Sequence, residues 1–196
     1  MQRPLPLFFV VHALVSPIVA GCGGGEIEPS TVLYPPPVCS VDVATHADEG
    51  GQHVPSCSKV SYGTNPPSSG SHYPVWSAFN RYTAPVPRGF LVHNLEHGAM
   101  VVSYRPDASA ADVDAIARWA DALPADPDCP ERRLVIAPDP LLDVPFAAAT
   151  WGVTLRAACF DAPQFTRFFR DHVGHAPEQV CAGGADLTQS MPGCGE

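Results

Sequence analysis

The sequence has few basic residues, no internal repeat and no run of like charges. Eleven lysines and arginines stand against 20 aspartates and glutamates, so the 196-residue chain carries a formal net charge of −9. The overall field of so acidic a chain does not attract nucleic acid or an anionic lipid surface. We therefore expect no nucleic-acid partner.

The sequence also lacks an apolar run that could span a bilayer as a helix of the mature protein. Its longest apolar stretch, LFFVVHALVSPIVA, is interrupted by His12 and Pro17 and follows the positive charge of Arg3. A short apolar segment behind a basic N-terminus is typical of a secretory signal peptide. We assign residues 1–21 to this signal.

The signal ends in VAGC, which resembles the lipobox of bacterial lipoproteins. In that interpretation Cys22 is diacylated and becomes the new N-terminus; the alternative is an ordinary signal peptide cut near Gly21. Residues 22–38 then form a flexible tether, and residues 39–196 a single domain. We expect a lipoprotein of the cell envelope, anchored in the membrane by lipid and facing the periplasm or the exterior.

The six cysteines that remain show no CxxC spacing, which argues against a redox or zinc motif. In an oxidising compartment six thiols predict three disulfides. Sequence alone allows many connectivities, and we prefer the pairs that bracket short segments. These pairs are Cys39 with Cys57, Cys129 with Cys159, and Cys181 with Cys194.

Twenty-three prolines and 16 glycines predict long ordered loops instead of many long helices. The hydrophobic pattern adds a few regular elements and indicates an α+β class, a single compact disulfide-stapled domain with a mainly antiparallel sheet and two helices. Residues 27–70 should be mostly loop. Strands are expected at 59–62, at 99–104, at 132–138 and within 147–160, and helices at 107–123 and 161–174.

Two of these strands bear on a disulfide. If the strand at 132–138 pairs antiparallel with the strand that follows it, Cys129 and Cys159 come to the same end of the sheet.

The segment HNLEH, residues 93–97, concentrates polar groups between two apolar runs. In an extended chain His93 and His97 would lie about 13 Å apart, too far to share a ligand. One helical turn would place His93, Glu96 and His97 on a single arc, and Gly98 is a natural end for it. We expect a strand end, one turn and a strand, facing a proline-rich loop at 63–74 that presents His72.

The motifs NPPSSGSHYP and VHNLEHGAMVVSY, with HVP before them and HAPE after them, resemble the family called domain of unknown function 3105. The similarity covers roughly residues 51–178. It implies no activity, because none is established for that family. The matching signature positions are His53, Pro66, Pro67, Gly70, His72, His93, Asn94, Leu95, Glu96, His97 and Gly98.

Neutral imidazoles with one carboxylate are typical ligands of zinc or copper. We expect a metal-binding protein, a carrier, sensor or scavenger, more than an enzyme. One alternative is a zinc-dependent hydrolase with Glu96 as base, since HxxEH occurs in metallopeptidases, although Gly98 would cut that helix short. Another is a structural envelope module whose histidines form only hydrogen bonds. The candidate ligands are His93, His97, His72, Glu96 and His53.

Overall fold

The computed structural model describes residues 39–194. The predicted signal peptide (1–21), the predicted lipidation site Cys22 and the tether (22–38) lie outside this range. The elements in chain order are β1 (Val41–Thr45), α1 (Arg88–Glu96), β2 (Met100–Tyr104), α2 (Ala110–Ala122), β3 (Leu134–Pro138), β4 (Phe146–Thr150), β5 (Val153–Ala157) and α3 (Ala162–His172).

One five-stranded sheet organises the domain, in the order β1-β5-β4-β2-β3. The pair β2–β3 is parallel, and the other three neighbouring pairs are antiparallel. Interior strand β2 is buried along its whole length, and apolar residues occupy both of its faces. The mainly antiparallel α+β class is therefore confirmed.

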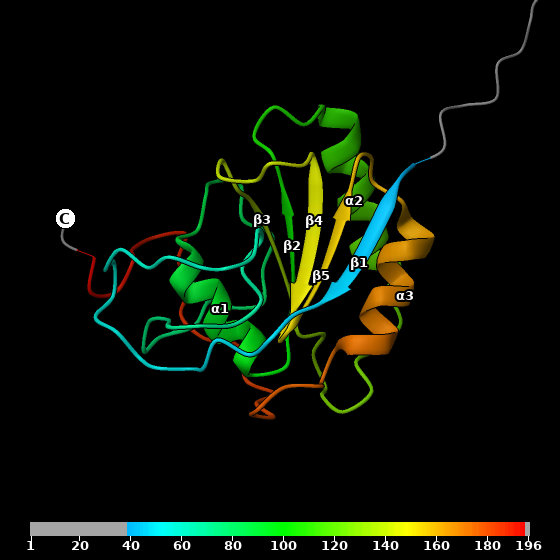
Figure 1. Ribbon diagram of the computed structural model, residues 1–196. Helices are drawn as coiled ribbons and strands as arrows, with labels where there is room; N and C mark the ends of the chain where they lie inside the picture. Colours follow the sequence, from blue (N-terminus) through cyan, green and yellow to red (C-terminus); the bar gives the residue numbers. More distant parts are fainter. Residues whose placement is uncertain (1–38, 195–196) are drawn as a thin grey trace, which may run out of the picture. The chain divides into compact units, whose positions relative to one another are not determined.

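The helices lie on both faces of the sheet (Figure 1). Helices α2 and α3 cover one face, where Met100 and Val102 pack against their apolar residues. Helix α1 and the long loops cover the other face, where Val101 and Val135 meet Phe90. Successive residues of a strand thus pack into two separate hydrophobic cores, one on each face of the sheet. The candidate ligands lie on the same face as α1.

Both predicted helices form, and their caps explain where they begin. The Ser109 side chain accepts a hydrogen bond from the Asp112 amide ahead of α2, and Asp161 accepts one from the Gln164 amide ahead of α3. Each cap satisfies an amide that the first helical turn leaves without a backbone partner. Helix α2 therefore starts at Ala110, a few residues inside the predicted range.

A third helix replaces the predicted strand end before HNLEH. Helix α1 spans nine residues, and all those from Gly89 to Glu96 are buried. A helix buried on every side has no exposed polar face, so its first half, RGFLV, shows no alternation of polar and apolar residues at helical spacing. The expectation of a strand end and a single turn was wrong in this respect, whereas the helical arc for His93 and Glu96 holds.

Two expectations for the N-terminal half were also wrong. Residues 59–62 form no strand, and Val41–Thr45 forms edge strand β1, paired antiparallel with β5. The alternation of Val41 and Val43 was a usable signal. It was masked by the surrounding proline and glycine, which favour loops.

Three disulfides form, as expected, but none of the preferred pairings is correct. The bridges are Cys39–Cys159, Cys57–Cys194 and Cys129–Cys181, which join residues 120, 137 and 52 positions apart. The Cys129–Cys159 prediction assumed that β3 pairs antiparallel with the strand that follows it. Instead, β3 lies at the sheet edge and pairs in parallel with β2, so it is not hydrogen-bonded to β4 or β5. Three bridges in one domain are typical of an oxidising compartment.

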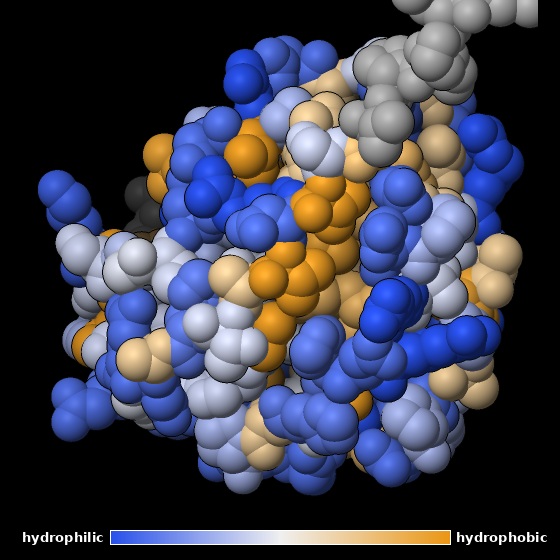
Figure 2. All heavy atoms as spheres, turned by 45° about the vertical axis from the view of Figure 1, so that its right-hand side comes forward, coloured by the Kyte–Doolittle hydropathy of each residue, from blue (hydrophilic) through white to orange (hydrophobic). Residues whose placement is uncertain are grey.

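The surface is largely polar on the face that Figure 2 presents, with apolar side chains gathered in a band between polar borders. Val43 and Leu141 are the exposed large apolar residues of the described part. Among residues 39–194 there is no helix long and apolar enough to cross a membrane.

Candidate metal centre

Three histidines and a glutamate converge beside α1. One ligand atom from each of His53, His72, His93 and Glu96 lies within 4.8 Å of the others. The three imidazole rings form a nearly equilateral triangle, with centroids 4.8 to 4.9 Å apart. These residues come from three separate parts of the chain, so the tertiary fold creates the cluster.

A short backbone pairing brings His53 beside His72. The His72 amide donates to the Gln52 carbonyl at 3.0 Å, and the Val54 amide donates to the His72 carbonyl at 2.8 Å. Gly51 next to this pairing packs against Glu96, and a Cβ there would collide with the Glu96 carboxylate. The glycine therefore allows the loop to approach the carboxylate closely.

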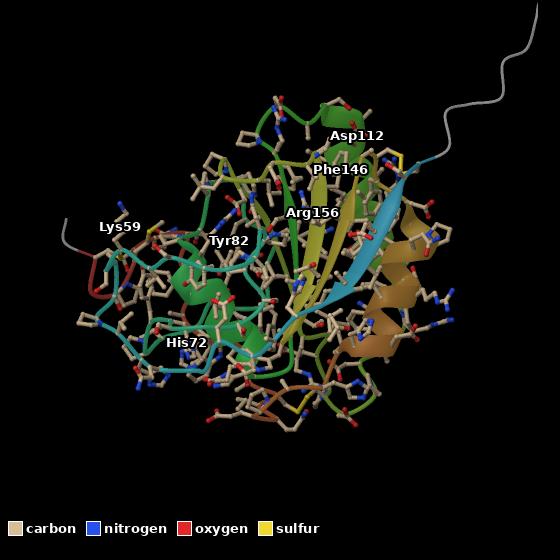
Figure 3. All side chains as sticks on the ribbon, viewed as in Figure 1. Lys59, His72, Tyr82, Asp112, Phe146 and Arg156 are labelled. Carbon is tan, nitrogen blue, oxygen red and sulfur yellow. A yellow bond between two sulfur atoms is a disulfide. The ribbon has the colours of Figure 1, made fainter. Side chains whose placement is uncertain are left out.

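Helix α1 supplies the other half of the cluster. His93 and Glu96 are three positions apart, so they share one face of the helix. The chain leaves the helix at Gly98, which adopts a φ of +87° that glycine tolerates without strain. Figure 3 shows His72 next to α1, on the side away from α2 and α3.

Asn94 fixes the neighbouring loop and does not point its amide at the cluster. Its Oδ1 accepts hydrogen bonds from the Ser77 amide at 3.0 Å and the Ser77 hydroxyl at 2.7 Å, and its Nδ2 donates to the Ser77 carbonyl at 2.8 Å. Both residues are fully buried. The hydrogen bonds to Ser77 thus satisfy the Asn94 side chain, and they hold in place the loop that carries Trp76.

Backbone carbonyls determine the tautomers of His72 and His93. Nδ1 of His72 lies 2.9 Å from the Gly70 carbonyl, and Nδ1 of His93 lies 2.6 Å from the Tyr73 carbonyl. A carbonyl only accepts, so each Nδ1 carries the proton. In the neutral rings both Nε2 atoms then keep a lone pair, and this arrangement is the usual one for histidines that bind metal.

The Nε2 lone pair of His72 meets a negative group. Nε2 lies 2.9 Å from Oε2 of Glu96, and both side chains are nearly buried. A lone pair and a carboxylate oxygen repel one another unless a cation lies between them, either a proton or a metal ion. The contact therefore marks a position that favours positive charge.

His93 is held in its neutral form. Its pKa is lowered from the usual 6.5 to about 4, mainly because burial disfavours the charged ring. The hydrogen bond to the Tyr73 carbonyl opposes this shift, and the nearby rings of His97, His72 and His53 add to it. The lone pair of His93 is thus available at neutral pH.

His97 lies in an adjacent group with Glu96 and Glu178. Its Nε2 is 3.1 Å from Nε2 of His93 and 3.1 Å from Oε2 of Glu178. Its pKa is lowered by burial, which outweighs the opposing effect of the two carboxylates. Its Nδ1 is buried and has no hydrogen-bond partner among residues 39–194, so the described backbone does not determine this tautomer as it does for His72 and His93.

Two tryptophans form walls around the cluster. Trp76 packs its ring against His93 and His97, with centroids 5.1 and 4.4 Å away, and Trp151 approaches His72 edge-on at 6.3 Å. These rings keep water from the buried imidazoles on two sides, which strengthens electrostatic interactions there.

The two ligand groups reach solvent through one residue each. His53 and Glu178 are exposed, whereas His72 and His93 are buried. The cluster is therefore buried on the side of His72 and His93 and open to solvent on the side of His53 and Glu178.

All five predicted ligands lie in one contiguous region, with His53, His72, His93 and Glu96 in one group and His97 in the next. Met100 faces the core under α2 and α3 and is no ligand. The sequence reasoning missed Glu178 and Trp76. Glu178 is the last residue of the HAPE motif that contributed to the family resemblance, so a signal for it existed, whereas nothing near Trp76 distinguished it from a core aromatic residue.

The comparisons with known proteins agree with that resemblance. The model of the family described as protein of unknown function (DUF3105) matches residues 53–183. No curated protein and no solved structure matches the chain. The matched range contains every residue of both ligand groups.

Proposed function

Because the chain belongs to a family of proteins of unknown function (DUF3105), its role must be argued from the site, and we propose that it binds a zinc or copper ion through His53, His72, His93 and Glu96. The orientation of His72 and His93 carries the proposal. Each ring donates from Nδ1 to a backbone carbonyl and turns Nε2 into the cluster.

The ligand set suits a tetrahedral ion, and small side-chain movements would give its atoms, now within 4.8 Å of one another, the required spacing. Zinc lies about 2.0 to 2.1 Å from imidazole nitrogen, so ligand atoms around a tetrahedral ion lie about 3.4 Å apart. The 2.9 Å between His72 Nε2 and Glu96 Oε2 needs a small outward movement to reach this spacing. Three imidazoles and a carboxylate would complete the coordination, and a closed site suits a carrier, sensor or scavenger better than a catalyst.

Substitution of the two buried histidines tests the proposal. His72→Gln and His93→Gln should each lower the affinity for Zn²⁺ or Cu²⁺ at least about 100-fold, measured by calorimetric titration of untagged protein. The exposed His175 lies outside both ligand groups, so His175→Gln should bind as the parent does. Unchanged binding by both folded variants would rule the site out.

Glu96→Gln separates binding from hydrolysis. A carboxylate that acts only as general base can be lost without loss of the ion, so a hydrolase would keep its metal and lose turnover. Glu96 lies in both ligand groups, and we expect the substitution to weaken binding itself. Full metal occupancy with loss of a measured hydrolytic activity would favour the alternative.

We also propose that the protein is an envelope lipoprotein anchored through Cys22. The VAGC sequence after an apolar segment supports the anchor, and the three disulfides support export. Cys22→Ser should abolish labelling by fatty acid and release the protein from membranes. Labelling and membrane association that survive the substitution would exclude this anchor.

A further inference from the structure

The segment 174–180 runs along the C-terminal end of α1 and carries Glu178 to His97. Three of its amides donate to carbonyls at the end of the helix, at distances of 2.9 to 3.4 Å. These carbonyls would otherwise lack a partner, because a helix leaves its last turn unsatisfied. The three donor–acceptor pairs are Gly174 with Gly98, Glu178 with Glu96, and Val180 with His97.

Side chains hold the same segment from the other side. Nη1 of the fully buried Arg133 donates to Oε1 of Gln179 at 2.9 Å. The disulfide Cys129–Cys181 ties the end of the segment to the loop before β3. The side chain of Glu178 is therefore exposed, but its backbone is held by these contacts. They keep its carboxylate beside the buried imidazole of His97.

Glu96, His97 and Glu178 bring three ligand atoms within 4.8 Å of one another. Two carboxylates thus approach one imidazole, with Oε2 of Glu178 at 3.1 Å from Nε2 of His97. Glu96 belongs to this group and to the three-histidine group. A carboxylate has two oxygens and can bind a metal through each.

The two ligand groups are close enough to hold two neighbouring metal ions. Nε2 of His93 and Nε2 of His97 lie 3.1 Å apart and belong to different groups. Ions bound to these two atoms would be neighbours, and two-metal sites in proteins hold their ions about 3.5 to 4 Å apart.

From this geometry we propose that the protein binds a second transition-metal ion through His97 and Glu178, with Glu96 bridging it to the first. The inference rests on the proposed function, because Glu96 bridges only if the first ion is bound. One imidazole and two carboxylates make a harder ligand set than three imidazoles, and it suits zinc or manganese.

The second ion should bind more weakly than the first. Nδ1 of His97 has no hydrogen-bond partner in the described part of the chain, whereas Nδ1 of His72 and of His93 donates to a carbonyl. Loss of such an outer partner weakens a metal site by about 10- to 100-fold. The two ions should therefore load in sequence and not together.

Titration of the mature, untagged protein with Zn²⁺ alone tests the proposal. The parent should bind two equivalents, the second with a Kd about 10- to 100-fold higher than the first. Glu178→Gln should bind one equivalent with the affinity of the first unchanged. Glu131 is exposed and lies outside both groups, so Glu131→Gln should bind two.

Copper gives a second, independent measurement. With Cu²⁺ as the probe, one equivalent should give the paramagnetic resonance spectrum of an isolated ion. A second equivalent should reduce that signal, because two ions joined by one carboxylate couple magnetically. In Glu178→Gln the signal should stay that of an isolated ion.

The possible failures are distinguishable. One equivalent in the parent, with no difference in Glu178→Gln, would overturn the second site and leave the proposed function intact. Two equivalents in both proteins would overturn the assignment to Glu178. No bound metal in the parent would overturn both proposals.

Discussion

At the scale of single residues, the contact between His72 and Glu96 links the hydrogen-bond network of the cluster to its capacity to bind a cation. In such a network each buried donor faces an acceptor. Nε2 of His72 lies 2.9 Å from Oε2 of Glu96, and Nδ1 already donates to a carbonyl, so two acceptors face each other here unless a cation joins them. A cation at this point removes the repulsion, and a proton and a metal ion compete for the same lone pair.

The depressed pKa of His93 predicts how the metal-free protein responds to acid. The ring takes up a proton near pH 6.5 in the unfolded chain but near pH 4 in the folded protein. The unfolded state therefore binds more protons in this window, and acid favours unfolding. The free energy of unfolding should fall by up to about 3 kcal/mol from this residue as the pH drops from 6.5 to 4.

Denaturant titrations at several pH values, in the presence of a chelator, measure this effect. In His93→Gln the loss of stability between pH 6.5 and 4 should be smaller by the contribution of that ring. The exposed His175→Gln should follow the parent curve. Parallel curves for the parent and His93→Gln would show that the ring is not held neutral by the fold.

The residues of HNLEH were predictable because their spacing alone puts His93, Glu96 and His97 on one helical face. The place of His72 followed from the rigid loop before it. The position of Glu178 was not predictable from spacing, because it depends on backbone hydrogen bonds to the end of α1 from a segment 76 to 83 residues further along the chain.

At the scale of elements, Arg133 connects β3 with the end of α1 and the segment 174–180. Its side chain is fully buried and forms two hydrogen bonds of 2.9 Å to the buried Asp126. Burial raises the pKa of Asp126, but hydrogen bonds from Arg133 and neighbouring amides more than reverse this and lower it. The pair is therefore ionised and mutually dependent.

Removal of Arg133 should destabilise the fold strongly. Arg133→Met leaves the Asp126 carboxylate buried without its partner, and loss of one member of a buried pair costs about 3 to 5 kcal/mol. The exposed pair of Arg81 and Asp121 provides a control, since Arg81→Met should change stability by less than about 1 kcal/mol. Thermal or denaturant unfolding measures both.

A double variant separates the charge from the packing. In Arg133→Met with Asp126→Asn part of the stability should return, because the substitution removes the buried charge and keeps an oxygen that can accept from the backbone amides of Asp128 and Cys129. If Arg133→Met alone unfolds no more easily than Arg81→Met, the buried pair does not stabilise the domain as described.

Two elements show why part of the fold could not be predicted. Helix α1 is buried on all sides from Gly89 to Glu96, so no polar stripe reveals its period. Strand β1 is short and lies at the edge of the sheet, where pairing with β5 stabilises it. In contrast, α2 and α3 carry capping residues and an exposed face, and both were predicted.

At the scale of the whole molecule, the order of the strands accounts for the Cys39–Cys159 disulfide. The β1–β5 register places Val41 opposite Ala157, and two further residues along that register Cys39 comes opposite Cys159. Each bridge joins segments far apart in the sequence. Pairing by sequence proximity failed because the sheet order, which brings the first strand beside the last, is a property of the complete chain.

The same global folding assembles the cluster of candidate metal ligands. His53, His72 and the pair on α1 come from segments that the sheet and the loops bring together, and the disulfide Cys57–Cys194 closes the loop that follows His53. The site is therefore a property of the folded domain. Short peptides that carry HNLEH should lack it.

The most direct test of the central claim is a crystal structure of the untagged protein with Zn²⁺, with diffraction recorded at the zinc absorption edge. We predict an anomalous peak about 2.0 to 2.1 Å from Nε2 of both His72 and His93. A folded protein without such a peak, or with zinc bound only at surface histidines such as His175, would contradict the account.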